Sequence, residues 1–299
     1  MSNTTTRIVV GLVGIPAIIA IIMQGGWLFF VFVQVIAVLA LKELYDLSAH
    51  KSFAPNVWIG YAACVAFGSI VFAEQMLSVE QSAWLFQALV GALVLTVLSV
   101  ELWRNKPQAL ANTATTLMGV VYVGWCMQAL LQLRMVFFHP VGQRLLPLVH
   151  HLDSSPLPQT ANSWGSALVM CTFAGIWICD SAAFFAGKAF GNHKLFPRVS
   201  PNKSWEGALV GFVMSAASFA VLAQYFLPFL PLVHAAVLGA LIGIVGQIGD
   251  LVESLLKRDA GVKDSSHIIP GHGGIFDRFD SILFAAPVTY LYVKALALF

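Results

Sequence analysis

The chain has 299 residues, of which 59% are hydrophobic and only 10% are charged, and its formal net charge is +2. An ordinary soluble domain has about 25% charged residues, so the composition excludes such a domain and indicates an integral membrane protein. A net charge this small gives no reason to expect nucleic acid as a partner. At about 20 residues per span, the length allows a whole helical bundle.

Nine apolar runs could cross a bilayer as helices. They lie at residues 8–23, 27–41, 57–73, 84–100, 115–133, 164–186, 207–229, 232–249 and 279–298. The sequence therefore predicts an all-α fold, a polytopic membrane bundle of about nine transmembrane helices. We expect two regions: residues 1–163, with the first five spans and an outer loop, and residues 164–299, with the last four spans and cytoplasmic loops.

Basic residues are concentrated on one side of the predicted bundle. When nine spans alternate across the membrane, all of the 16 Lys and Arg fall on the same side except Arg134, Arg144 and Lys294. Cytoplasmic loops carry an excess of Lys and Arg, so this side is predicted to be cytoplasmic. The amino terminus then lies inside and the carboxyl terminus outside.

Acidic residues gather in the last four spans and their loops. Those after residue 179 all map to the cytoplasmic side, namely Asp180, Glu206, Asp250, Glu253, Asp259, Asp264, Asp277 and Asp280. A carboxylate at membrane depth is costly unless it is paired or binds a cation, so these residues are candidates for function.

The first polar constellation follows the sixth span. Asp180 lies in an otherwise apolar run, where an unpartnered carboxylate is strongly disfavoured. The segment SPNKSWEG (200–207) is interpreted as a donor-rich turn before the seventh helix, whose amino end favours anions, and Lys203 adds a positive charge. The alternative is structural, with Ser204 as a helix cap and Trp205 as an interfacial anchor.

The second constellation, GQIGDLVES, ends the eighth span. Its Asp250 and Glu253 are three residues apart and therefore share a helix face, where two carboxylates repel each other unless a cation lies close. A metal or phosphate role is one interpretation. The other is that Asp250 pairs with Lys257 or Arg258 at the helix end.

The third constellation, residues 254–280, is rich in charge and glycine. Lys257, Arg258 and Lys263 could neutralise a polyphosphate, and glycines on both sides of His272 allow backbone N–H groups to converge on an anion. A loop of solvated charges is the alternative. His272 could be a general acid or base, a phosphate donor or a structural residue.

Asp277 and Asp280 open the ninth span three residues apart, again on one helix face. Carboxylates beside basic residues and glycines indicate nucleotide phosphates held with Mg²⁺, because hard oxygen ligands suit that ion and phosphates complete its coordination.

These motifs resemble one known family. The run SLLKRDAGVKDSSHIIPGHGGIFDRFD, with CDSAAFFAGKAFG and SPNKSWEG upstream, is similar to the phosphatidate cytidylyltransferases, or CDP-diacylglycerol synthases. Asn202 and Ser204 stand where the family's usual SPKKTWEG has lysine and threonine. Residues 1–163 resemble the family only in their apolar helices, their basic amino end and the segment KELYDL.

The resemblance implies a membrane enzyme of phospholipid biosynthesis. Its reaction converts CTP and phosphatidate to CDP-diacylglycerol and diphosphate, with Mg²⁺, at the cytoplasmic face of the bacterial inner membrane. It also implies a two-metal site that includes Asp250 and Asp277, with K⁺ as a candidate second cation. A homodimer is left open as an expectation.

The candidate residues follow from the motifs and the resemblance together, and most lie in the region 164–299. The catalytic candidates are Asp250, Asp277, Lys203 and Lys257. The metal candidates are Asp250 and Asp277, with Glu253 and Asp280 as further ligands. The substrate-binding candidates are Ser200, Asn202, Ser204, Glu206, Arg258, Lys263, His272, Gly273, Gly274, Arg278 and Asp180.

In the expected mechanism, a phosphate oxygen of phosphatidate attacks the α-phosphorus of CTP in line. This nucleophile is already anionic, so no strong general base is required, and His272 is assigned to binding. The alternatives are a CTP-dependent kinase acting on a polyprenol or phytol, and a secondary transporter. A CDP-alcohol phosphotransferase is disfavoured because the chain has no D-x2-D-G-x2-A-R segment.

Overall fold

The computed structural model describes residues 3–138, 140–145, 160–269 and 273–298. In chain order the elements are α1 (Asn3–Gln24), α2 (Gly26–Ala49), α3 (Val57–Ala73), α4 (Val79–Arg104), α5 (Ala109–Gly119), the π-helical η1 (Val120–Trp125), α6 (Cys126–Met135), the 3-10 turn η2 (Val136–Phe138), α7 (Pro140–Gln143), α8 (Ala161–Phe190), β1 (Lys194–Phe196), β2 (Ser200–Ser204), α9 (Trp205–Phe226), α10 (Leu232–Asp259) and α11 (Phe276–Leu298).

The predicted all-α membrane fold is confirmed. Within the described residues, 7 helices are long and apolar enough to cross a membrane, and two shorter apolar helices, Gly11–Gln24 and Val57–Ala73, accompany them. Helices satisfy every backbone polar group within the segment, which a hydrocarbon environment requires. Together these helices account for the nine predicted spans, and the protein is an integral membrane protein.

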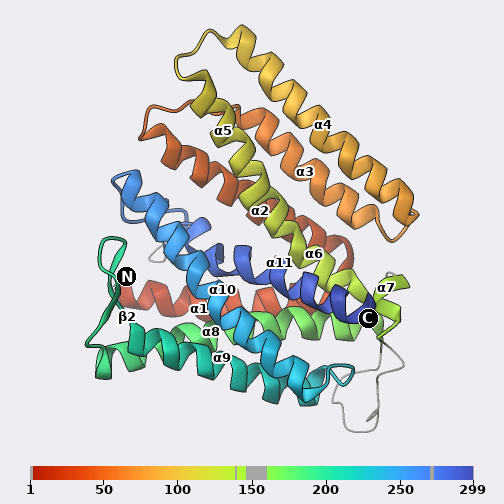
Figure 1. Cartoon of the computed structure of the whole chain (residues 1–299), viewed down its shortest axis with the longest axis vertical. Coiled ribbons are helices and arrows are strands. Elements are labelled where there is room, and N and C mark those ends of the chain that lie inside the picture. Colours follow the sequence, from red (N-terminus) through yellow and green to blue (C-terminus); the bar gives the residue numbers. More distant parts are fainter. Residues whose placement is uncertain (1–2, 139, 146–159, 270–272, 299) are drawn as a thin grey trace. The chain divides into compact units, whose positions relative to one another are not determined.

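The chain divides into two compact units. The first unit comprises Met1–Gln132 and Leu256–Phe279, and the second comprises Leu133–Leu255 and Asp280–Phe299. In the first unit, α3 packs against both α2 and α4 (Figure 1). Phe67 of α3, Val97 of α4 and Val120 of η1 belong to one apolar core in this unit. The predicted regions 1–163 and 164–299 were defined by role, and that division stays a prediction.

Helix α2 runs beyond residue 41, where the predicted second span ends. The segment KELYDL keeps the helical period, because Leu44 is buried while Lys42 and Asp46 are exposed and form an i,i+4 ion pair of 2.5 Å. Glu43 falls on the buried face of the same turn and is completely enclosed. An acidic residue is thus carried into the interior of the first unit.

In the second unit, α8 and α9 lie side by side along their lengths (Figure 1). The antiparallel strands β1 and β2 connect them, with Phe196 opposite Ser200 and Lys194 opposite Ser204. The turn expected at residues 200–204 is therefore wrong, and the segment is a short strand. Proline disfavours helical geometry in the residue before it, which holds Ser200 in an extended conformation.

Candidate active site

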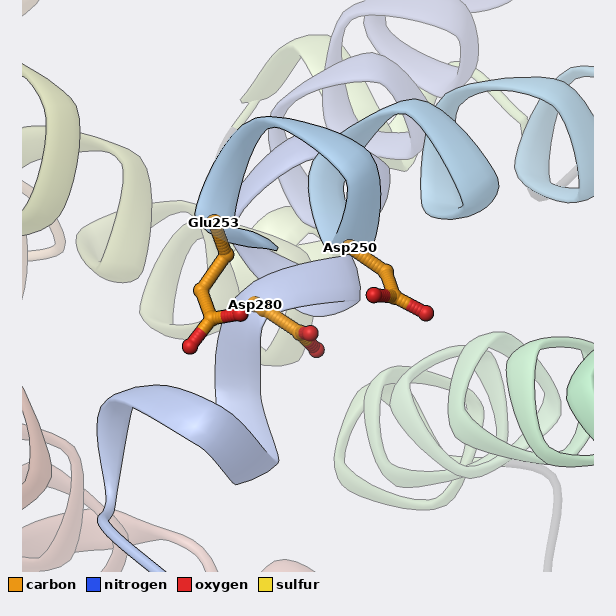
Figure 2. Close-up of side chains that lie close together, drawn as sticks. All are labelled: Asp250, Glu253 and Asp280. Atoms are coloured by element: carbon orange, nitrogen blue, oxygen red, sulfur yellow. The ribbon is translucent and has the colours of Figure 1, made fainter. Parts of the chain in front are cut away.

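Three carboxylates meet in the second unit. Asp250 and Glu253 project from α10 and Asp280 projects from α11 near its amino end, and a carboxylate oxygen from each lies within 4.8 Å of the others (Figure 2). Glu253 is 1% exposed. Three like charges this close repel one another unless a cation is present, and hard oxygen donors suit Mg²⁺. The residues therefore fit a divalent cation.

Lys203 brings a positive charge to this cluster. Its Nζ lies 2.6 Å from Oδ2 of Asp250, and the Ser254 hydroxyl donates to the other oxygen of the same carboxylate at 3.3 Å. The ion-pair partner of Asp250 is thus a residue of β2, not Lys257 or Arg258 at the helix end. Strand β2 therefore holds the lysine against a carboxylate of α10.

Asp180 is the fourth acidic residue of this group. It projects from α8 and interacts electrostatically with Asp250 and Lys203, and Asp280 interacts with Asp180 and Asp250 in the same way. Three helices thus contribute carboxylates, and one strand contributes a lysine, to the same charged environment. Such clustering of ionisable groups is typical of functional sites in membrane proteins.

The close approach of α10 and α11 depends on Gly249. A Cβ atom there would lie 2.7 Å from the carbonyl oxygen of Asp280 and 3.2 Å from Cα of Ser281. Gly246, one turn earlier, is more open, since its Cβ would lie 3.7 Å from the Ser281 side chain. The packing of α10 against α11 can therefore accommodate a methyl group at Gly246 but not at Gly249.

We expect Gly249→Ala to lower both stability and activity, because the new methyl group must push α11 and the Asp280 carboxylate away. Overpacking of this kind costs about 1–3 kcal/mol. The matched control, Gly246→Ala, should be neutral or slightly stabilising, because alanine favours the helix more than glycine does. Unfolding in mixed micelles and the turnover rate measure both effects. Equal behaviour of the two variants would contradict this packing argument.

Asp277 occupies a second polar cluster, in the first unit. Its Oδ1 lies 2.7 Å from Nζ of Lys257, and its Oδ2 accepts hydrogen bonds from Oγ of Ser265 at 3.0 Å and from the Gly274 N–H at 2.8 Å. The Asp277 side chain is 4% exposed. The N–H of Gly274, one of the amides expected to face an anionic ligand, thus donates to a carboxylate of the chain itself.

Asp277 is not among the three carboxylates that cluster in the described residues. It falls in the first unit, whereas Asp250 falls in the second. The predicted metal site shared by Asp250 and Asp277 therefore stays a prediction. Glu253 and Asp280, expected as further metal ligands, are the two residues that accompany Asp250.

Sequence reasoning missed Glu43. Its carboxylate accepts hydrogen bonds from Ser265, Ser266 and two backbone N–H groups in the segment that leads to Asp277. The signal that could have found it is helical phase. Extending the second span through KELYDL places Glu43 on the apolar face, where an unpartnered carboxylate is costly.

Four substrate-binding candidates of the second unit lie in strand β2 or directly after it. Ser204 caps α9, because its Oγ accepts the N–H of Gly207 at 3.2 Å. Glu206 accepts the N–H of His193 at 3.2 Å. Ser200 is half-buried and Asn202 is exposed. The helix-capping interpretation of Ser204 is confirmed, and the binding roles of these residues stay predictions.

The substrate-binding candidates of the first unit are mostly at its surface. Arg258 donates to the carbonyl oxygen of Val262 at 3.1 Å, while Lys263 and Arg278 are exposed. Gly273 accepts a backbone hydrogen bond from Ile269 at 2.9 Å. His272 lies outside the described residues. Exposed positive charges near a chain turn are compatible with phosphate binding, which stays a prediction for these residues.

The comparison with protein families is decisive. The model of the cytidylyltransferase family matches residues 5–296. The chain belongs to the cytidylyltransferase family. The family match covers the first five spans, where the motifs alone said little.

Known relatives that match most of this chain agree with this family. The phosphatidate cytidylyltransferase of Synechocystis sp. is 34% identical over 296 residues, which cover 98% of this chain and 97% of that protein. A protein of the same name from Staphylococcus aureus is 32% identical over 292 residues, 96% of each chain. Phosphatidate cytidylyltransferase 5, chloroplastic, of Arabidopsis thaliana is 31% identical over 277 residues, 92% of this chain and 68% of that protein. The resemblance expected from the motifs is confirmed.

Proposed function

We propose that this protein is a phosphatidate cytidylyltransferase, which converts CTP and phosphatidate to CDP-diacylglycerol and diphosphate in phospholipid biosynthesis. The observation that carries the proposal is similarity over nearly the whole chain to proteins of that name. The cluster of Asp250, Glu253 and Asp280 with Lys203 supports it. Transfer between two polyanionic substrates requires positive charge to neutralise their phosphates, and here a cation held by the carboxylates and the lysine would provide it.

In the proposed reaction, a phosphate oxygen of phosphatidate forms a bond to the α-phosphorus of CTP. The bond from that phosphorus to the oxygen of the β-phosphate breaks, and diphosphate leaves with the electron pair. A Mg²⁺ ion held by Asp250, Glu253 and Asp280 would supply neutralisation of phosphate charge. Lys203, which Asp250 holds in place, is assigned to the charge on the departing diphosphate.

Asp277 and Lys257 are retained as proposed participants, with K⁺ or Mg²⁺ as a second cation. The Lys257 ammonium pairs with Asp277 at 2.7 Å, so it is available to exchange that carboxylate for a substrate phosphate. Ser200, Asn202, Ser204, Glu206, Arg258, Lys263, His272, Gly273, Gly274, Arg278 and Asp180 are proposed to contact or orient the substrates.

The proposed location is the bacterial cytoplasmic membrane, with the amino terminus and the site on the cytoplasmic side and the carboxyl terminus outside. The distribution of Lys and Arg supports this orientation. In it, the acyl chains of phosphatidate stay in the bilayer while the head group reaches the charged helix ends. The homodimer stays a prediction, because no observation concerns a second copy of the chain.

The proposed function predicts that purified protein releases diphosphate only when CTP, phosphatidate and Mg²⁺ are all present. Chelation with EDTA should stop release and added Mg²⁺ should restore it, because the three carboxylates hold the cation. Product analysis distinguishes the rivals. Release of CDP would favour a lipid kinase, and uptake into vesicles without nucleotide turnover would favour a transporter. Replacing K⁺ by Na⁺ in the assay tests the second cation.

A further inference from the structure

Glu43 of α2 is a buried carboxylate that holds a distant segment of the chain. It is 0% exposed. One oxygen accepts from the hydroxyl of Ser266 at 2.6 Å and the N–H of Ile275 at 2.9 Å. The other accepts from the hydroxyl of Ser265 at 2.8 Å and the N–H of Phe276 at 2.7 Å. Two of these donors lie in the middle of the loop that precedes α11, and the other two lie where the loop meets that helix.

The Glu43 contacts continue directly to Asp277. The hydroxyl of Ser265 lies within hydrogen-bonding distance of both carboxylates, 2.8 Å from Glu43 and 3.0 Å from Asp277. Phe276 is the first residue of α11 and the neighbour of Asp277 in the chain. The first N–H groups of a helix have no partner within the helix, and Glu43 supplies one from another part of the fold.

Gly274 completes this arrangement by lacking a side chain. A Cβ atom there would collide with the Ser265 hydroxyl and with an oxygen of Glu43, and would lie 2.8 Å from the Glu43 carboxyl carbon. The N–H of Gly274 donates to Asp277 at 2.8 Å. The sequence suggests that a glycine here makes room for an anionic ligand, whereas in the structure it makes room for a carboxylate of α2.

We infer that Glu43 is a positioning residue for cytidylyl transfer, which acts by fixing Ser265, Ser266 and the start of α11 at Ile275 and Phe276, and thereby the orientation of Asp277. The inference rests on the proposed function, in which Asp277 participates. Glu43 is 0% exposed and is enclosed by donors of the chain itself. Its effect on the reaction passes through Asp277 and Ser265.

The four donors make the carboxylate hard to replace. Glutamine has the same shape, but it presents one oxygen and one NH₂ group. A serine hydroxyl can rotate to accept from the NH₂ group, whereas a backbone N–H cannot. Glu43→Gln therefore leaves one backbone donor of the helix start facing another donor. Alanine leaves all four donors without this acceptor.

The experiment measures kcat, KM and amide hydrogen exchange for Glu43→Gln, Glu43→Ala and a matched control, Asp46→Asn. Asp46 lies on the exposed face of the same helix, so its variant removes the same charge without touching the loop. We expect kcat to fall about 10-fold in the glutamine variant and about 100-fold in the alanine variant, because small misplacements of reacting groups have effects of that size. In both Glu43 variants, KM for CTP should stay within about 3-fold of wild type. In the control Asp46→Asn, kcat and KM should both stay within that range.

Exchange of the amides in residues 273–279 should rise in both Glu43 variants and stay unchanged in Asp46→Asn. This readout needs no substrate, so it tests the Glu43 contacts even if wild-type protein releases no diphosphate, the result that would refute the proposed function. Gly274→Ala should reproduce the exchange pattern of Glu43→Gln, because its methyl group displaces the same carboxylate.

A double-mutant cycle of Glu43→Gln with Ser265→Ala separates positioning from general destabilisation. If Glu43 acts through Ser265 and Asp277, the two losses in kcat should be clearly less than additive. Additive losses would overturn the inference. So would wild-type kcat in Glu43→Ala, or a rise in KM with kcat unchanged.

Discussion

Replacing Asp250 by asparagine is expected to lower the rate of diphosphate release by about 1,000-fold. The substitution keeps the shape of the side chain but removes one of the three charges, with those of Glu253 and Asp280, that are proposed to bind a cation. Stabilisation of phosphate charge by a bound metal is worth several kcal/mol, and about 4 kcal/mol corresponds to three orders of magnitude in rate. Steady-state kinetics over a range of Mg²⁺ concentrations measures both the rate and the Mg²⁺ requirement.

Two further variants separate the metal role of Asp250 from its ion pair with Lys203. Lys203→Met breaks the same 2.6 Å contact but leaves all three carboxylates in place. It should lower the rate without raising the Mg²⁺ requirement, whereas Asp250→Asn should raise that requirement. Asp264→Asn, at an exposed carboxylate of the loop after α10, is the control and should be unchanged. Full turnover of Asp250→Asn would refute the metal assignment.

Lys257→Met is expected to destabilise the protein by about 3–5 kcal/mol, because removal of one partner leaves the other charge of a buried pair uncompensated. The Lys257 and Asp277 side chains are 12% and 4% exposed, so water can replace little of the lost interaction. The hydrogen bonds that Asp277 accepts from Ser265 and Gly274 remain in the variant. The free energy of unfolding in mixed micelles is the measurement.

The first unit contains a matched control for the Lys257 experiment. Lys51 pairs with Asp259 at 3.1 Å, but these side chains are 39% and 63% exposed. Lys51→Met should therefore cost less than about 1 kcal/mol, as exposed ion pairs do. The double variant Lys257→Met/Asp277→Asn should recover part of the stability lost in the single variant. Equal costs for Lys51→Met and Lys257→Met would contradict the burial argument.

The two polar clusters differ in what they can offer to a ligand. In the second unit, carboxylates face one another and Lys203, an arrangement that a cation would stabilise. In the first unit, Asp277 and Glu43 already accept hydrogen bonds from serine hydroxyls and backbone amides. The second unit thus has the geometry of a metal site, while the first has the geometry of an internally braced loop.

Parts of the carboxylate cluster of Asp250, Glu253 and Asp280 could be predicted from spacing alone. Asp250 and Glu253 share a helix face because they are three residues apart. Asp280 could be assigned to the same membrane side because the loop between the last two spans returns there. The partner of Asp250 could not be predicted, because Lys203 lies 47 residues away on a strand that was expected to be a turn.

The amino-acid sequence by itself determined the membrane character, the order of the helices and the family, because each depends on local composition or on contiguous motifs. Long apolar runs must become helices where no water can satisfy the backbone. Only the tertiary structure decided which polar groups meet. Glu43 and Phe276 are separated by 233 residues, and no periodic pattern records a contact over that distance. Such contacts arise because buried donors and acceptors must find partners within the packed fold.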